Sequence, residues 1–206
     1  MTDGRILDSL LSKVRQLDSP ESVDSYSGRT SPLPVRCSVG PHEPWNREGL
    51  ERRLDAAIPP DLALLWDRTS KLRLFEDIRY GQWGLVIWGP AHALRESPLE
   101  IVRRKKDFRR GDLVVGEFLG DAELLVVRCD RGADDFGNVT IALEIDPRDE
   151  WPIVGKSFIE FLDKYVAAAG DKFWEPETKE CTSCRGGMPV MSMTCPHCGE
   201  PQGLAP

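Results

Sequence analysis

The chain has 206 residues, 40% of them hydrophobic and 30% charged, so it can build a folded core and is not disordered throughout. Its formal net charge of −7 opposes a global electrostatic attraction to nucleic acid or to an anionic membrane. No apolar run is long enough to span a bilayer, and the first residues do not resemble a secretory signal. We therefore expect a cytoplasmic protein without a membrane partner, whose reduced cysteines are metal ligands or buried thiols.

Residues 1–17 predict an N-terminal amphipathic helix. Its apolar side chains recur at helical spacing on one face and are Ile6, Leu7, Leu10, Leu11, Val14 and Leu17. From 18 to 45 the chain is rich in Ser and Pro and loses its apolar periodicity. This change indicates either a linker or an irregular wrapping segment, and we favour a linker.

Residues 46–177 predict an α+β domain. Asn46 is a good N-cap for one helix, and Pro60 followed by Asp61 suits the first turn of the next. Ser157 and Glu160 form a capping box, which predicts a last helix that stops at Gly170.

Apolar segments between these helices predict strands that form a meander. They cover residues 72–74, 83–88, 113–119, 124–129 and 139–145. The turn at Gly120 and the acidic loop 130–138 are too short to hold a crossover helix, so antiparallel pairing is expected. Trp66, Trp83 and Trp88 fall on these predicted elements and are interpreted as core packing.

Four motifs, in this order, resemble the SUKH superfamily of Smi/Knr type. They are Ile58–Leu62 at the start of a helix, the Trp83 and Trp88 segment, Gly116–Asp121 and Ser157–Leu162. The superfamily includes fungal cell-wall assembly regulators and many bacterial immunity proteins. The resemblance, over roughly residues 46–174, implies a curved, mostly antiparallel sheet flanked by helices. It also implies a protein-binding scaffold that in bacteria often neutralises a toxin domain, without catalysis.

The cysteine pattern at residues 178–206 predicts a small zinc-ribbon-like tail. Cys181 and Cys184 are separated by two residues, as are Cys195 and Cys198. Two such pairs supply the four thiolates that Zn²⁺ prefers, and four protein ligands leave no open position, so we expect structural zinc. A redox pair or a disulfide hairpin are the alternatives, but no βαβ pattern surrounds the cysteines. His197, between two ligands, is interpreted as exposed or outside the ligand set.

Cys37, in the predicted linker, and Cys129, at the end of a predicted strand, have no partner visible in the sequence. We interpret both as ordinary thiols, with Cys129 buried.

Charge is unevenly distributed along the predicted domain. Residues 103–110 carry +5, whereas residues 112–151 carry eleven acids and three arginines. The acidic side chains that could meet a basic partner are Glu117, Asp121, Asp130, Asp134 and Asp135. The alternative, which we favour slightly, is a solvated meander edge that charge protects from aggregation. We interpret the basic run as a solvated helix face rather than a phosphate site.

The sequence lacks the common enzyme motifs, including G-x-S-x-G, the P-loop and H-E-x-x-H, so we expect no catalytic residues. The leading hypothesis is an immunity protein that binds and neutralises a toxin domain, possibly a nuclease. A regulatory adaptor, whose zinc tail contacts nucleic acid or a second protein, is the main alternative. The charges of the tail sum to zero, which favours protein over nucleic acid. A novel enzyme site is a third hypothesis.

Overall fold

The computed structural model describes residues 2–18, 34–175, 178–189 and 192–202. The chain forms two compact units, which we call the main unit (Met1–Asp171) and the cysteine module (Lys172–Pro206). In the described part of the chain, no helix combines the length and the apolar character needed to cross a bilayer.

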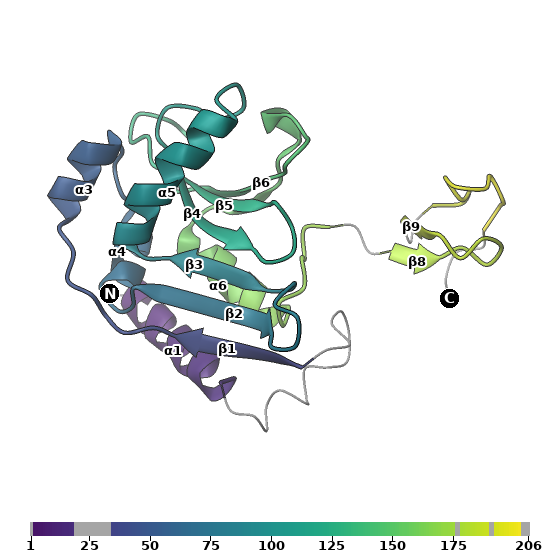
Figure 1. Ribbon diagram of the computed structural model, residues 1–206, viewed down its shortest axis with the longest axis horizontal. Coiled ribbons are helices and arrows are strands. Elements are labelled where there is room, and N and C mark those ends of the chain that lie inside the picture. The colour runs from purple at the N-terminus through teal and green to yellow at the C-terminus, as the bar shows by residue number, and fades with distance from the viewer. Residues whose placement is uncertain (1, 19–33, 176–177, 190–191, 203–206) are drawn as a thin grey trace. The chain divides into compact units, whose positions relative to one another are not determined.

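The main unit is built on an antiparallel sheet whose neighbouring strands follow chain order from β1 to β7 (Figure 1). The strands are β1 (Val35–Val39), β2 (Lys71–Asp77), β3 (Leu85–Trp88), β4 (Asp112–Phe118), β5 (Leu124–Arg128), β6 (Val139–Ala142) and β7 (Ile153–Gly155). The helices are α1 (Thr2–Gln16), α3 (Arg47–Leu54), α4 (Pro60–Trp66), α5 (Pro90–Arg103) and α6 (Phe158–Ala167), with a short 3-10 turn η1 (Arg148–Glu150). The predicted α+β class and the antiparallel meander are confirmed.

Helices cover both faces of the sheet, so its central strands are buried on both sides. In Figure 1, α5 lies in front of the sheet and α6 behind it. On one face, Val86, Val114 and Val126 join a buried cluster against which Ile101 of α5 packs. On the other, Tyr165 of α6 packs edge-on against Phe118. Side chains that alternate along a strand point to opposite faces, so β3 is apolar throughout, and β5 and β6 each carry one polar residue, Arg128 and Thr140.

The predicted helix starts at Asn46, Pro60 and Ser157 are confirmed. The side chain of Asn46 accepts a hydrogen bond from the Gly49 N–H at the start of α3, and Pro60 opens α4. The Ser157 hydroxyl accepts from the Glu160 N–H at the start of α6. Gly170, three residues beyond α6, has a φ of +87°, a left-handed conformation that glycine adopts without strain.

A single carboxylate joins two of the motifs that carry the SUKH resemblance. Asp61 is 8% exposed, and its Oδ2 accepts hydrogen bonds from the N–H groups of Phe158 and Ile159, the first residues of α6. These N–H groups have no acceptor within their own helix, and the negative charge is favourable at the positive end of the helix dipole. Asp61 therefore fixes the N-terminus of α6 against α4.

The glycines of the third motif permit close approach of backbone segments. A Cβ on Gly116 would lie 2.5 Å from the carbonyl oxygen of Val86 on the neighbouring strand. Gly120 turns the chain between β4 and β5 with a φ of +84°, and a Cβ there would lie 2.1 Å from the Gln82 carbonyl oxygen. These motif positions therefore serve the fold.

The predicted linker, residues 18–45, is wrong in part. Its residues 35–39 form strand β1, which pairs with β2 at the edge of the sheet, whereas residues 19–33 lie outside the described residues. The N-terminal helix, predicted as a separate segment, belongs to the main unit, where Leu7 and Val14 are buried. The main unit ends at residue 171 rather than at the predicted 177.

Two further differences concern residues around β3. Trp66 and Trp88 are buried as predicted, at 1% and 4% exposure, but Trp83 is only half-buried. Helix α5 was not predicted, although it covers the sheet and its Ser97 hydroxyl accepts a hydrogen bond from the Val114 N–H. Pro98 stands inside this helix, where proline removes a backbone donor and normally signals a helix end.

Replacing Asp61 with alanine tests the link between α4 and α6. The change leaves the N–H groups of Phe158 and Ile159 without their acceptor, and each buried unsatisfied donor costs about 1–3 kcal/mol. We expect the free energy of unfolding, measured by urea denaturation, to fall by that amount for each donor. Asp163→Ala, on the exposed part of α6, is the matched control and should change stability little. Equal stability of the two variants would contradict the capping role.

Candidate functional site

The cysteine module contains two turns with the same backbone hydrogen bonds. We call residues 181–186 the first knuckle and residues 195–200 the second knuckle. In each, the N–H of the first cysteine donates to the carbonyl five residues later, at 3.0 Å, and its carbonyl accepts from the N–H four residues later, at 2.9 Å. The residue after the second cysteine, Arg185 or Gly199, has a positive φ in both. Each knuckle thus turns its own pair of sulfurs to one side.

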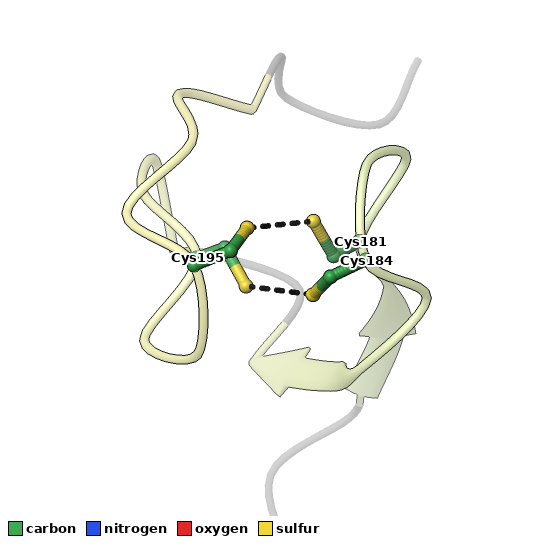
Figure 2. A group of neighbouring side chains, drawn as sticks. Cys181, Cys184 and Cys195 are labelled. Atoms are coloured by element: carbon green, nitrogen blue, oxygen red, sulfur yellow. Dashed lines mark hydrogen bonds between the residues drawn. The ribbon is translucent and has the colours of Figure 1, made fainter.

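The two knuckles bring all four predicted cysteines together. Their Sγ atoms lie within 4.8 Å of one another, and no other metal-binding group of three or more His, Cys, Asp or Glu occurs among the described residues. The closest sulfurs belong to different knuckles: Cys181 to Cys198 and Cys184 to Cys195, both at 3.7 Å (Figure 2). Four converging sulfurs can hold a metal ion such as zinc.

Electrostatics at this cluster favour a bound cation. The backbone N–H of Cys184, followed by that of Ser183, lowers the pKa of the Cys181 thiol to about 6. The Glu200 N–H favours the Cys198 thiolate, but desolvation and the three neighbouring sulfurs outweigh it and raise the pKa of Cys198 to about 12. One thiolate therefore makes deprotonation of the neighbouring thiols less favourable, and a bound divalent cation would remove that repulsion.

His197 and Cys129 are placed as predicted, whereas Cys37 lies on a strand instead of in a linker. His197 is exposed. Cys129 is 1% exposed, and desolvation raises its thiol pKa far above the ordinary value. Cys37 is equally buried, on β1, where its sulfur accepts a hydrogen bond from the Phe75 N–H and desolvation raises its pKa to about 11. Both are unreactive thiols in the main unit.

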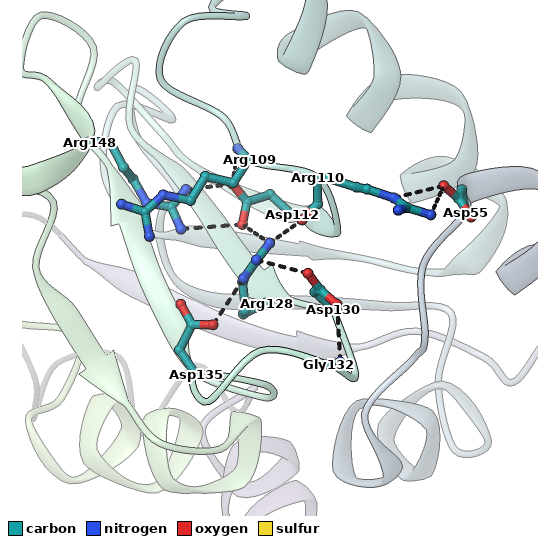
Figure 3. Close-up of polar contacts among 9 residues, drawn as sticks. All are labelled: Asp55, Arg109, Arg110, Asp112, Arg128, Asp130, Gly132, Asp135 and Arg148. Carbon is teal, nitrogen blue, oxygen red and sulfur yellow. Dashed lines mark hydrogen bonds and ion pairs between the residues drawn. The ribbon is translucent and has the colours of Figure 1, made fainter.

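The acidic loop is held by one buried arginine. Arg128, whose side chain is 10% exposed, pairs with Asp135 at 3.0 Å, Asp130 at 3.2 Å and Asp112 at 3.4 Å (Figure 3). Asp112 has a fully buried side chain and also pairs with Arg148. A buried carboxylate requires such partners, because an unpaired buried charge is costly. Ion pairs therefore attach the loop to the sheet, although Arg131, Gly132 and Asp134 are exposed, as expected for a solvated segment.

The structure separates the five predicted partner-binding acids into two groups. Asp130, Asp134 and Asp135 follow the C-terminal end of β5, whereas Glu117 and Asp121 lie at the other end, beside the β4–β5 turn. This second group lines a cavity of about 500 Å³, which we call the acidic hollow. The hollow is lined by Trp88, His92, Glu96, Glu100, Arg103, Arg104, Glu117, Asp121, Ala122, Glu123, Leu124 and Glu144.

The acidic hollow has a negative balance of charge. Six carboxylates and two arginines line it. His92 stacks on Trp88 with ring centroids 4.8 Å apart, and desolvation together with the charge of Arg95 lowers its pKa. The imidazole is therefore neutral at pH 7 and does not offset the carboxylates. A concave, negatively charged wall of this kind suits a positively charged side chain.

Sequence reasoning missed the carboxylates that α5 contributes. One face of α5 carries His92, Glu96 and Glu100, which recur every four residues. This pattern could be recognised in the sequence only if the segment were predicted as a helix despite Pro98. The basic run was also misplaced. Only Arg103 belongs to α5; Arg104 follows it, with its guanidinium over the Trp151 ring and a bond to the Asp146 carbonyl. The run is therefore largely solvated, as predicted, but it forms a turn after α5 rather than a helix face.

Comparisons with known proteins find no family model and no curated protein that matches this chain. The SUKH resemblance, which rests on the motifs at 58–62, 83–88, 116–121 and 157–162, therefore stays a prediction. Function must be inferred from the residues themselves.

Replacing Arg128 with methionine tests whether it holds the acidic loop. Truncating one partner of a buried ion pair typically costs about 3–5 kcal/mol, because the other charge stays buried without compensation. We expect a loss of this size in the free energy of unfolding, measured by urea denaturation. Arg131→Met, an exposed arginine of the same loop, is the control and should unfold like the wild type. A wild-type midpoint for Arg128→Met would show that Asp112 does not depend on it.

Proposed function

We propose that this protein is a non-catalytic binding protein, an immunity protein that neutralises a basic toxin domain by covering it. The single observation that carries this proposal is the acidic hollow, a concave surface whose carboxylates outnumber its arginines. The SUKH resemblance supports it, because Asp61 and the α6 N-terminus join two of the resembling motifs within one fold. Complementary charge speeds encounter with a basic partner and sets its orientation.

The hollow is a better candidate interface than the acidic loop. In the loop, Asp130 and Asp135 already pair with Arg128. In the hollow, Asp121 and Glu144 are exposed at the rim. Because these two carboxylates are exposed, a basic partner can reach them from solvent. The partner should therefore bind over α5 and the β4–β5 turn.

The cysteine module is proposed to hold one structural Zn²⁺ through Cys181, Cys184, Cys195 and Cys198. Zinc–sulfur bonds of about 2.3 Å in a tetrahedron place sulfurs about 3.8 Å apart. The two closest pairs of the cluster, at 3.7 Å, fit this spacing. A bound zinc would supply folding free energy to a module too small for a core of its own.

The adaptor role is the second candidate, and one observation favours it. The cysteine module is a compact unit separate from the main unit, so it could contact a second protein independently. A variant that lacks the module but still binds the toxin-like partner would fit either this adaptor role or a purely structural role of the module.

Metal content tests the zinc assignment. The purified protein should carry about one zinc per chain by elemental analysis, and Cys198→Ser should lose it because three thiolates no longer close the site. The thermal unfolding of the main unit should stay unchanged. Cys37→Ala, which removes a cysteine outside the cluster, should keep the zinc. Full zinc occupancy in Cys198→Ser would exclude the assignment.

Charge reversal tests the proposed interface. We expect the double variant Asp121→Lys, Glu144→Lys to lose a toxin-like protein that the tagged wild type captures from its native host, because like charges then face a basic partner. The wild-type complex should also form more slowly at higher salt. Binding is measured by biolayer interferometry with the captured protein at several ionic strengths.

The matched control is Asp134→Lys, Asp149→Lys, which changes the charge equally on exposed residues at the loop end of β5. It should bind like the wild type. Loss of binding in the control alone would move the interface to the loop, and unchanged binding in both would remove the acidic surfaces from recognition. Recovery of no toxin-like protein would count against the immunity role itself.

A further inference from the structure

The two knuckles are joined by one buried side chain. Gln202, which follows the second knuckle, is 6% exposed and reaches across to Thr182 in the first. Its Oε1 accepts from the backbone N–H and from the hydroxyl of Thr182, both at 3.0 Å. Its Nε2 donates to the carbonyl oxygens of Pro201 at 3.1 Å and Glu200 at 3.4 Å. The carboxamide thus uses two acceptor and two donor positions, its full capacity.

The polarity of these bonds fixes the orientation of the amide. The Thr182 N–H can only donate, so it requires the amide oxygen, and the carbonyls of Glu200 and Pro201 can only accept, so they require the amide nitrogen. No hydrocarbon side chain of the same size can replace this pattern. Gln202 therefore spans the two knuckles with a specific set of hydrogen bonds.

The Gln202 link affects the positions of the sulfurs, because the two shortest Sγ–Sγ distances join one knuckle to the other. Thr182 directly follows Cys181, and Glu200 lies two residues after Cys198, so Gln202 connects the backbones that carry the pair 3.7 Å apart. Backbone bonds within each knuckle orient only that knuckle's own cysteines. The backbone N–H of Gln202 also donates to the carbonyl of Met193 at 2.8 Å. Met193 precedes the second knuckle and Gln202 follows it, so this bond holds Gln202 beside the start of the knuckle.

We propose that Gln202 is a positioning residue that sets the two cysteine pairs against each other for a single four-sulfur metal site. The inference rests on the proposed zinc binding and adds to it a residue that touches neither the metal nor a sulfur. Residues that orient ligands from outside the ligand set typically contribute about 10- to 100-fold to metal affinity. Gln202 acts by reducing the freedom of the two knuckles to move relative to each other, which the ion would otherwise have to remove on binding.

Zinc affinity of the full chain tests the proposal. Gln202→Met keeps the length and volume of the side chain but removes its four hydrogen bonds. We expect its Zn²⁺ affinity, measured by competition with a chromogenic chelator, to fall by about 10- to 100-fold. Thr182→Val, which removes one of these bonds, should lower affinity by about 2- to 10-fold. Saturation with Co²⁺ should still give the absorption of a tetrahedral four-thiolate site in both variants.

Thr194→Val is the matched control, because Thr194 directly precedes Cys195 and is exposed. It should bind zinc like the wild type. Wild-type affinity in Gln202→Met would overturn the proposal, since it would reduce the role of Gln202 to filling space. Complete loss of zinc binding in Gln202→Met would support the proposal if Thr182→Val also binds zinc more weakly. If Thr182→Val binds zinc like the wild type, the proposal is overturned. A wild-type chain without zinc would instead refute the zinc assignment on which this proposal depends.

Discussion

The buried carboxylate of Asp112 determines how the acidic half of this protein is organised. Because its side chain is fully buried, it requires Arg128 and Arg148 as partners. Arg128 has further donors, which draw in Asp130 and Asp135 and so fold the acidic loop onto the sheet. What the sequence presents as one continuous acidic stretch is thereby divided. One part pairs with buried Arg128, and the other, around Glu117, lines the acidic hollow.

Much of the fold can be predicted because local signals agree with the tertiary structure. Caps at Asn46 and Ser157 mark helix starts, and short apolar runs mark the central strands. Predictions failed where a distant contact overrides the local pattern. Strand β1 lies in a Ser- and Pro-rich segment and is held by pairing with β2, and α5 contains Pro98, whose missing donor is tolerated on an exposed position.

The residues of the candidate sites could also be predicted where local sequence patterns place them, and not where distant contacts do. The four cysteines could be assigned from the sequence, because each pair is local and its spacing alone dictates how the sulfurs turn. The link through Gln202 could not, since it joins residues twenty positions apart through side-chain polarity. The acidic hollow was only half predicted: Glu117 and Asp121 lie on the recognised hairpin, whereas Glu96 comes from the helix that sequence patterns missed.

We propose that the acidic hollow, and not the acidic loop, receives the partner. Hydrogen–deuterium exchange of the protein, alone and bound to the protein that it captures from its native host, tests this claim most directly. The account predicts slower exchange on binding in residues 92–103 and 117–123, which line the hollow. Exchange that slows only in the loop 130–138, or nowhere in the main unit, would contradict it.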